Sequence, residues 1–174
     1  MLGSWAGAQD EGRVWFADGR PSEVAHQAVS ILLGAAADGL EPDDYGAGGL
    51  EQTLGAAEAG ALDAAGQRAL EAALTRAMER YLADLHGGRA DLRAIQPGQR
   101  FERDNGFAPA EVLQAALAAG RLPEAVREAA PAQPDYSGLR RALGRYRELA
   151  EDPLRGGLWQ TPLAPLPGRK LEPG

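Results

Sequence analysis

An all-α fold is predicted for this chain, and three features of the sequence predict it. Alanine and leucine are abundant, while valine, isoleucine and aromatic residues are scarce, which favours helices over strands. Apolar residues recur at three- and four-residue steps in several segments, as they do along one face of a helix. Glycine and proline fall between these segments, where they end one helix and begin the next. We therefore expect an irregular multi-helix bundle around one long central helix.

The 174 residues divide by composition into three regions. Residues 1–20 mix glycine and polar residues with Trp5, Trp15 and Phe16, which predicts an irregular arm held by a few apolar anchors. Residues 21–152 are periodic and are expected to form one helical domain that buries a core without disulfides or metal. Residues 153–174 are rich in proline and glycine, so we expect no regular element there, but an exit segment towards a further domain.

The first helices are predicted from their ends. Ser22 is a suitable N-cap for a helix that runs until Gly39, whose left-handed conformation lets Leu40 fold back onto the helix. Residues 42–46 form a turn, and a short second helix follows and ends at Gly60. The inward face of that second helix is expected to contain Leu50, Leu54 and Ala57.

The central helix is predicted over residues 63–86, where the longest periodic pattern occurs. Its buried stripe is expected to consist of Leu70, Leu74, Ala77, Met78, Tyr81, Leu82 and Leu85. A long loop is expected from about residue 88 to 107. Three further helices are expected over residues 109–119, 123–130 and 135–150, the first of them opened by Pro109.

Composition excludes several classes of function. The net charge is −7 and the only lysine is Lys170, which disfavours binding of nucleic acid, because phosphates require a basic surface. The absence of cysteine excludes disulfides, thiolate zinc sites and a cysteine nucleophile in these residues. His26 and His86 do not have the spacing of a metal site, and no serine lies in a nucleophile elbow. We expect no metal, no cofactor and no catalytic residue.

The abundant carboxylates leave one enzymatic alternative open. An all-helical domain with a buried glutamate of raised pKa could cleave glycans in the manner of a muramidase. Solvated helix faces are the simpler interpretation of most of these carboxylates, and Asp43 and Asp44 are expected to bond their local backbone in a turn.

The end of the central helix carries further charged residues. Arg80 and Asp84 are spaced for an ordinary surface ion pair. Arg89 lies just past the helix end, where its guanidinium can bond the last carbonyls or Asp84, or contact a ligand.

No membrane span and no targeting segment is expected from the sequence. The longest apolar run, around residues 31–33, is far too short to cross a bilayer. The N-terminus lacks the basic and then apolar pattern of a signal peptide.

Several segments, in this order, resemble the helical scaffold domain of the large, YcbB-type L,D-transpeptidases of Gram-negative bacteria. Residues 37–45 read ADGLEPDDY and are similar to the family's DGL-x-P-x-DY turn, and residues 74–89 are similar to LT-x-A-x-x-RY-x-x-DL-x-x-GR. Residues 113–120 and 130–147 resemble L-x-x-AL-x-x-G and AP-x-x-P-x-Y-x-x-LR-x-AL-x-x-YR. Residues 157–159 and 171–174 resemble the family's exit signals, although Gln160 stands where proline is usual.

The resemblance implies a non-catalytic part of a cell-wall transpeptidase. In that family a cysteine attacks a tetrapeptide stem between an L- and a D-centre, and this chain contains no cysteine. The implied partners are the peptidoglycan-binding and catalytic domains of the same polypeptide, with peptidoglycan as a further partner, and the implied location is the periplasm or cell envelope. The alternative is a stand-alone helical adapter that binds a cell-envelope protein or a glycan.

The resemblance also implies a set of structural motif residues, none of them catalytic. Trp159 in the exit segment is the candidate for contact with the next domain, because an aromatic side chain on an extended segment needs a surface to bury against. The motif residues are Asp38, Gly39, Leu40, Pro42, Tyr45, Arg80, Tyr81, Asp84, Arg89, Tyr136, Tyr146 and Arg147.

Overall fold

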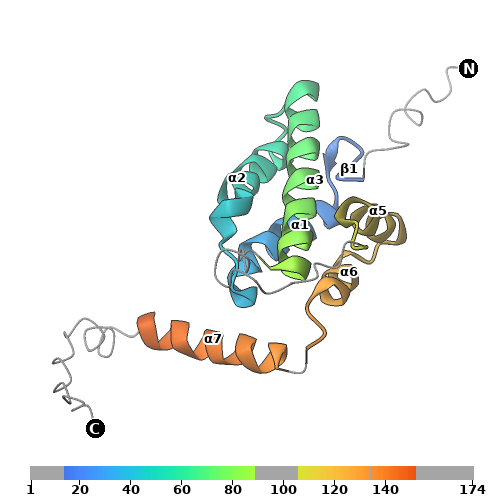
Figure 1. Cartoon of the computed structure of the whole chain (residues 1–174). Coiled ribbons are helices and arrows are strands. Elements are labelled where there is room, and N and C mark those ends of the chain that lie inside the picture. The colour runs from blue at the N-terminus through green and yellow to red at the C-terminus, as the bar shows by residue number, and fades with distance from the viewer. Residues whose placement is uncertain (1–13, 89–105, 134, 152–174) are drawn as a thin grey trace, which may run out of the picture.

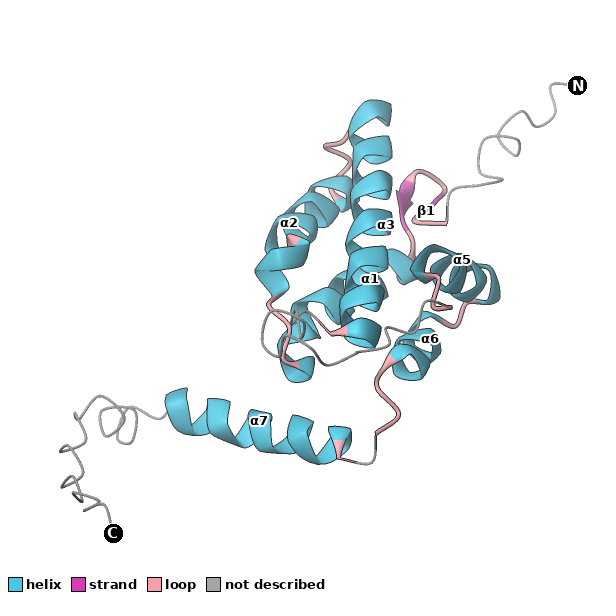
Figure 2. Ribbon diagram, viewed as in Figure 1, coloured by secondary structure: helices cyan, strands magenta, loops and turns pink. Residues whose placement is uncertain are grey.

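The computed structural model describes residues 14–88, 106–133 and 135–151, and this part of the chain is predominantly helical (Figure 2). It contains the helices α1, α2, α3, α5, α6 and α7, two short 3-10 helices and one two-stranded hairpin. The prediction of an all-α, multi-helix fold around a long central helix is confirmed. The exit segment 153–174 and the predicted loop, apart from its ends, lie outside the described residues.

A small hairpin precedes the helices where the predicted arm ends, and residues 1–13 of that arm lie outside the described residues. Strand β1 (Phe16–Ala17) pairs antiparallel with strand β2 (Arg20–Pro21). Asp18 and Gly19 both have positive φ, 52° and 74°, as a tight hairpin turn with matching twist requires. Two of the three predicted anchors, Trp15 and Phe16, are buried as expected, and Trp5 lies outside the described residues.

Those anchors fix the hairpin to the central helix. Trp15 and Phe16 are buried, and Trp15 Nε1 donates a 2.9 Å hydrogen bond to Thr75 Oγ1. The indole therefore fills the core while its one polar atom is satisfied.

Helix α1 (Glu23–Leu33) begins where the sequence predicts. The Ser22 hydroxyl oxygen accepts a hydrogen bond from the Ala25 amide and caps the first turn. The helix ends earlier than expected, because residues Gly34–Asp38 tighten into the 3-10 helix η1. Its buried face consists of Ala25, Ala28, Val29 and Leu32.

The next segment turns the chain back along the bundle. Residues Pro42–Tyr45 form the second 3-10 helix, η2, and Gly46 follows it in the left-handed conformation. Helix α2 (Ala47–Glu58) buries Ala47, Leu50, Leu54 and Ala57, which include all three residues predicted for its inward face.

Helix α3 (Ala64–Gly87) is the centre of the molecule. The Asp63 carboxylate caps it by accepting a 2.7 Å hydrogen bond from the Gly66 amide. Its buried residues are the seven predicted from the periodicity. It contacts α1, α2, α5 and α6, so the core forms around this one stripe (Figure 1).

Helices α5 (Pro109–Ala119) and α6 (Leu122–Ala129) cover another side of α3. His86, near the C-terminal end of α3, contacts Phe107 just before α5 and Ala129 at the end of α6. Its ring stacks on Phe107 at a centroid distance of 4.0 Å, and its Nδ1 lies 3.2 Å from the carbonyl oxygen of Ala129. This half-buried histidine therefore contributes a packing contact at the end of α3.

Helix α7 (Tyr136–Glu151) differs from the other helices, because it extends away from the bundle (Figure 1). Its main contact with the rest of the described chain is with η1. Two of its large apolar side chains, Leu139 and Tyr146, are 67% and 63% exposed. Within the described ranges, no helix is long and apolar enough to cross a bilayer.

Candidate functional site

The site is built on the reversal of the chain after η1. Gly39 has φ 77°, and the Leu40 amide donates a 3.2 Å hydrogen bond to the Ala35 carbonyl oxygen. This is the left-handed helix end predicted from the sequence, with Leu40 buried against the core. The reversal leaves Asp38 at the C-terminal end of a helix, where a carboxylate is unfavourable unless cations or donors meet it.

Three side chains meet the Asp38 carboxylate. The Tyr136 hydroxyl donates to Oδ1 over 2.7 Å, and the Tyr81 hydroxyl donates to Oδ2 over 3.2 Å. Arg140 Nε lies 2.7 Å from Oδ1 in an ion pair, while it is also 3.3 Å from the Ala37 carbonyl oxygen, to which it donates. Arg140 thus satisfies both the carboxylate and an orphan carbonyl of the helix end.

A second polar cluster lies on the neighbouring part of α3. The Tyr45 hydroxyl donates a 3.0 Å hydrogen bond to Asp84 Oδ2, and Arg80 Nε lies 3.9 Å from the same oxygen. The Arg80 guanidinium also lies over the Tyr45 ring, 5.9 Å from its centroid. The rings of Tyr45 and Tyr81 pack edge to face at 5.5 Å, which joins this cluster to Asp38.

The expected Arg80–Asp84 pair is present, but it is not an isolated surface pair. The Asp84 side chain is only 22% exposed, and its closer partner is Tyr45, which is 39 residues away in sequence. The carboxylate therefore anchors η2 to α3, and Arg80 adds to this contact from the solvent side.

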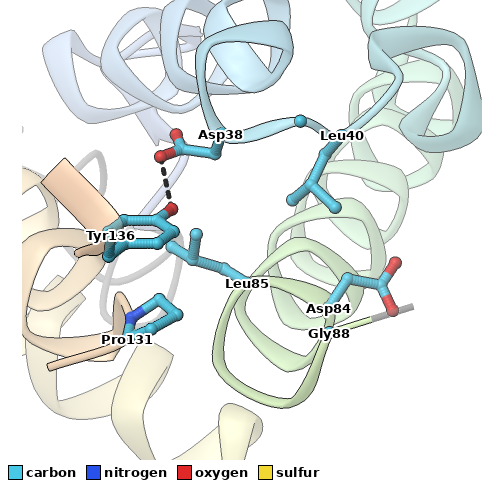
Figure 3. A pocket seen from close by; sticks show the side chains of 8 residues that line it. Asp38, Leu40, Asp84, Leu85, Gly88, Pro131 and Tyr136 are labelled. Atoms are coloured by element: carbon cyan, nitrogen blue, oxygen red, sulfur yellow. Dashed lines mark hydrogen bonds between the residues drawn. The ribbon is translucent and has the colours of Figure 1, made fainter. Parts of the chain in front are cut away.

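An open pocket of about 520 Å³ lies beside the two clusters. Figure 3 shows Asp38 and Leu40 on one side, Asp84 and Leu85 on the end of α3, and Tyr136 bonded to Asp38 near Pro131. Gly88 on its rim precedes residues 89–105, which lie outside the described residues.

Burial and Asp38 together change the acidity of two tyrosines. Desolvation, and then the hydrogen bond to the Asp38 carboxylate, raise the pKa of Tyr136 to about 12. The same causes raise the pKa of the Tyr81 hydroxyl further, although Arg140 opposes the effect on both. Both hydroxyls are thus held as neutral donors to Asp38 at physiological pH.

The arrangement binds segments of the chain to one another. Among the residues that the structure describes, no group of His, Asp and Glu side chains could hold a metal ion, and no charged side chain is fully buried. A glycan-cleaving enzyme needs an acid shielded from water, and Glu71 is half-buried with its Oε1 atom shielded, so that alternative stays a hypothesis.

The structure brings most of the predicted motif residues together. The residues Asp38, Gly39, Leu40, Pro42, Tyr45, Arg80, Tyr81, Asp84 and Tyr136 lie in or beside the two clusters. Tyr146 and Arg147 lie on α7, and Tyr146 has the exposed side chain described above. Arg89 and Trp159 lie outside the described residues, so their roles stay predictions.

Sequence reasoning missed Arg140, which bonds Asp38 more closely than Tyr81 does. The signal was present, because Arg140 is the arginine of the LR pair in the segment that resembles the family. Its partner could not be read from the sequence, since the two residues are 102 positions apart.

The fold and the site define a helical structural domain, in which the motif residues bond to each other across long sequence separations. A family model described as the Scaffold domain matches residues 8–143, so the chain belongs to the Scaffold domain family. This agrees with the resemblance to the scaffold domain of L,D-transpeptidases. No curated protein and no solved structure matches the chain. A non-catalytic scaffold role follows from this membership.

Proposed function

We propose that this chain is the scaffold domain of an L,D-transpeptidase and acts in the cross-linking of peptidoglycan in the cell envelope. The observation that carries the proposal is the convergence of three segments on Asp38. These are the turn at residues 37–45, the end of the central helix, and the start of α7, each of which resembles the corresponding transpeptidase segment.

The physical role would be to set the direction in which the chain leaves the bundle. Tyr136 and Arg140 fix the first turns of α7 to η1, and the rest of α7 extends outward (Figure 1). The Asp38 contacts therefore set the direction of α7, and with it the point from which a following domain would begin. In the proposed setting, the catalytic and peptidoglycan-binding domains would be held at a defined angle to the cell wall.

The proposal is tested by deleting the gene that contains this chain and analysing the muropeptides of isolated cell walls by mass spectrometry. We expect the cross-links made by L,D-transpeptidation to fall, and expression of the full gene to restore them. A matched strain that carries the gene with Asp43→Asn, a charge change at an exposed residue outside both clusters, should be restored equally well. Unchanged cross-links after deletion would contradict the proposal.

A second candidate is the stand-alone adapter that binds a cell-envelope protein or glycan. The exposed Leu139 and Tyr146 favour it, because apolar side chains on a protruding helix commonly contact another surface. Sedimentation of the purified 174-residue chain with isolated cell walls distinguishes the two. Micromolar binding by the chain alone, with L,D-type cross-links unchanged after deletion, would favour the adapter.

A further inference from the structure

Helix α7 is attached to the bundle without a fully buried side chain. The helices α1, α2, α3, α5 and α6 each bury at least two residues, as α5 does with Leu113 and Ala116. Among the side chains of α7 that the structure describes, the most enclosed are only half-buried. The apolar burial that fixes the other helices therefore contributes much less to the position of α7.

The contacts between α7 and η1 gather near the start of α7. Tyr136 and Arg140 bond the Asp38 carboxylate, and we call these two bonds the latch. The Leu143 side chain lies over Gly39, where an added Cβ would meet it at 3.7 Å. The rest of α7 extends away from the bundle (Figure 1). A helix that is held near one end can change its direction by giving up few contacts.

The joint between α6 and α7 has room for such a movement. The described residues of the connection, 130–133, lie outside any helix, and their side chains are half-buried or exposed. Beside them lies the open pocket of about 520 Å³, which is lined by Pro131 and Tyr136 and, at the end of α3, by Leu85. Because open space separates the start of α7 from the end of α3, α7 can turn without disturbing the packed core.

Opening the latch would leave its polar groups solvated. The Arg140 side chain is already 46% exposed, and Asp38, now 10% exposed, would gain water where Tyr136 and Arg140 lie. The Tyr81 hydroxyl would still donate to Asp38, since both residues belong to the bundle. Polar groups that exchange protein partners for water lose little free energy, in contrast to an ion pair that is broken inside a core.

We propose that the latch is a switch between two orientations of α7. In the docked orientation Tyr136 and Arg140 bond Asp38, as the structure shows. In the released orientation α7 turns as an intact helix about the connection that contains residues 130–133, and the groups of the latch are solvated. Dissolved salt weakens a partly exposed ion pair, so rising ionic strength shifts the balance towards release. The switch is a property of the chain itself and does not depend on a role in cross-linking.

Distances between two spin labels measure the orientations, and the absence of cysteine from the chain makes the labelling specific. One label is attached at Gln52→Cys on α2 and the other at Glu148→Cys on α7, both at exposed positions. Double electron–electron resonance on the purified chain should show a main distance and a minor, separate one. The minor component should grow about threefold between about 0.1 M and about 1 M sodium chloride, as the Debye length falls from about 10 Å to about 3 Å.

Two variants open the latch from opposite sides. Arg140→Gln removes the ion pair without altering the bundle, and Asp38→Asn removes the charge of its partner. Each should raise the ratio of released to docked chains about tenfold, and the salt dependence should be lost, because no ion pair is left to screen. Arg145→Gln is the matched control, since it removes an exposed arginine of the same helix and should leave both populations unchanged.

Two further pairs of labels separate release from unfolding. Cysteines in place of Arg141 and Glu148 lie within α7, and those in place of Gln52 and Gln114 lie within the bundle. Both of these distances should stay fixed in every variant and at every salt concentration. The proposal is overturned if the distance between α2 and α7 has one component that neither salt nor the latch variants change. It is equally overturned if either fixed pair broadens in step with that distance, because α7 then unfolds or the bundle loosens.

Discussion

Asp38 is the residue on which most of the polar contacts depend. Asparagine in its place keeps one acceptor oxygen, but its amide nitrogen is a donor that faces Arg140 or Tyr81, both donors themselves. We expect Asp38→Asn to lower the free energy of unfolding by about 2 kcal/mol, since hydrogen bonds to charged groups contribute about 1.5 to 3 kcal/mol. Urea titration followed by circular dichroism measures this loss.

The matched control is Asp43→Asn, which removes a carboxylate of the same type from an exposed position five residues further along. Surface substitutions of this kind change stability by about 0.5 kcal/mol or less. Equal effects of the two variants would show that the Asp38 contacts contribute nothing in solution.

Tyr136 gives the same cluster a pH dependence. Its pKa in the folded chain is raised to about 12 by burial and by Asp38, whereas an unfolded tyrosine titrates near 10. The folded state therefore holds its proton more tightly, and this contribution to stability is complete below pH 10 and is lost as the pH rises towards 12. We expect the urea midpoint to fall over this range, and less steeply in Tyr136→Phe. An equal fall of the urea midpoint with pH in the unmodified chain and in Tyr136→Phe would contradict the raised pKa of Tyr136.

Gly39 allows the left-handed backbone conformation at the turn that positions Asp38. Its φ is 77°, and a Cβ there would lie 3.7 Å from Leu143, which is ordinary contact. Gly39→Ala should therefore cost about 1 kcal/mol through backbone strain and not through a clash. The control is Gly55→Ala inside α2, where a methyl group meets open space and should add about 0.5 to 1 kcal/mol. In thermal unfolding, the melting temperature should fall in Gly39→Ala and rise in Gly55→Ala.

At the scale of elements, α7 should be the least stable helix. It contacts the bundle mainly at η1, whereas α3 has buried residues from Leu70 to Leu85 and contacts four other helices. We expect amides in the second half of α7 to exchange with solvent at least about 100-fold faster than those of α3, because few buried contacts oppose local opening. Hydrogen exchange with mass spectrometry measures both.

Hydrogen exchange of the Asp38→Asn variant tests whether Asp38 holds α7 in particular. It should speed exchange at the start of α7, where Tyr136 and Arg140 lose their partner, and leave α2 unchanged. Uniform acceleration in all helices would mean that Asp38 supports the bundle and does not hold α7 in particular.

The elements also show which information the sequence contains. Helix ends were predictable where the signal is local, as with the N-cap Ser22 and the left-handed Gly39. The Asp18-Gly19 pair is a hairpin signal, but strands of two residues are too short to show any period, so the hairpin was not predicted. In the site, the motif residues were identified, but not their pairing. Contacts such as Tyr136 with Asp38 join residues 98 positions apart and depend on the packing of whole helices.

At the scale of the whole molecule, a scaffold acts only through its shape and stability. The described chain has a core around α3 and a polar cluster at Asp38 that holds the start of α7. The open pocket lies beside this cluster. If the cluster serves structure, any change that restores stability should restore function. If Asp38 contacts a substrate in the pocket, added stability elsewhere cannot replace it.

The double variant Asp38→Asn, Gly55→Ala separates these two roles. Gly55 lies on the exposed side of α2, away from the cluster, so the gain of about 0.5 to 1 kcal/mol from Gly55→Ala should combine additively with the loss from Asp38→Asn. In cells that carry the gene, we expect Asp38→Asn to lower the L,D-type cross-links as the temperature rises, and Gly55→Ala to recover part of them together with the melting temperature. Recovery of the melting temperature without recovery of the cross-links would show that Asp38 contacts substrate or partner directly, because a distant methyl group can repair stability but cannot replace a carboxylate.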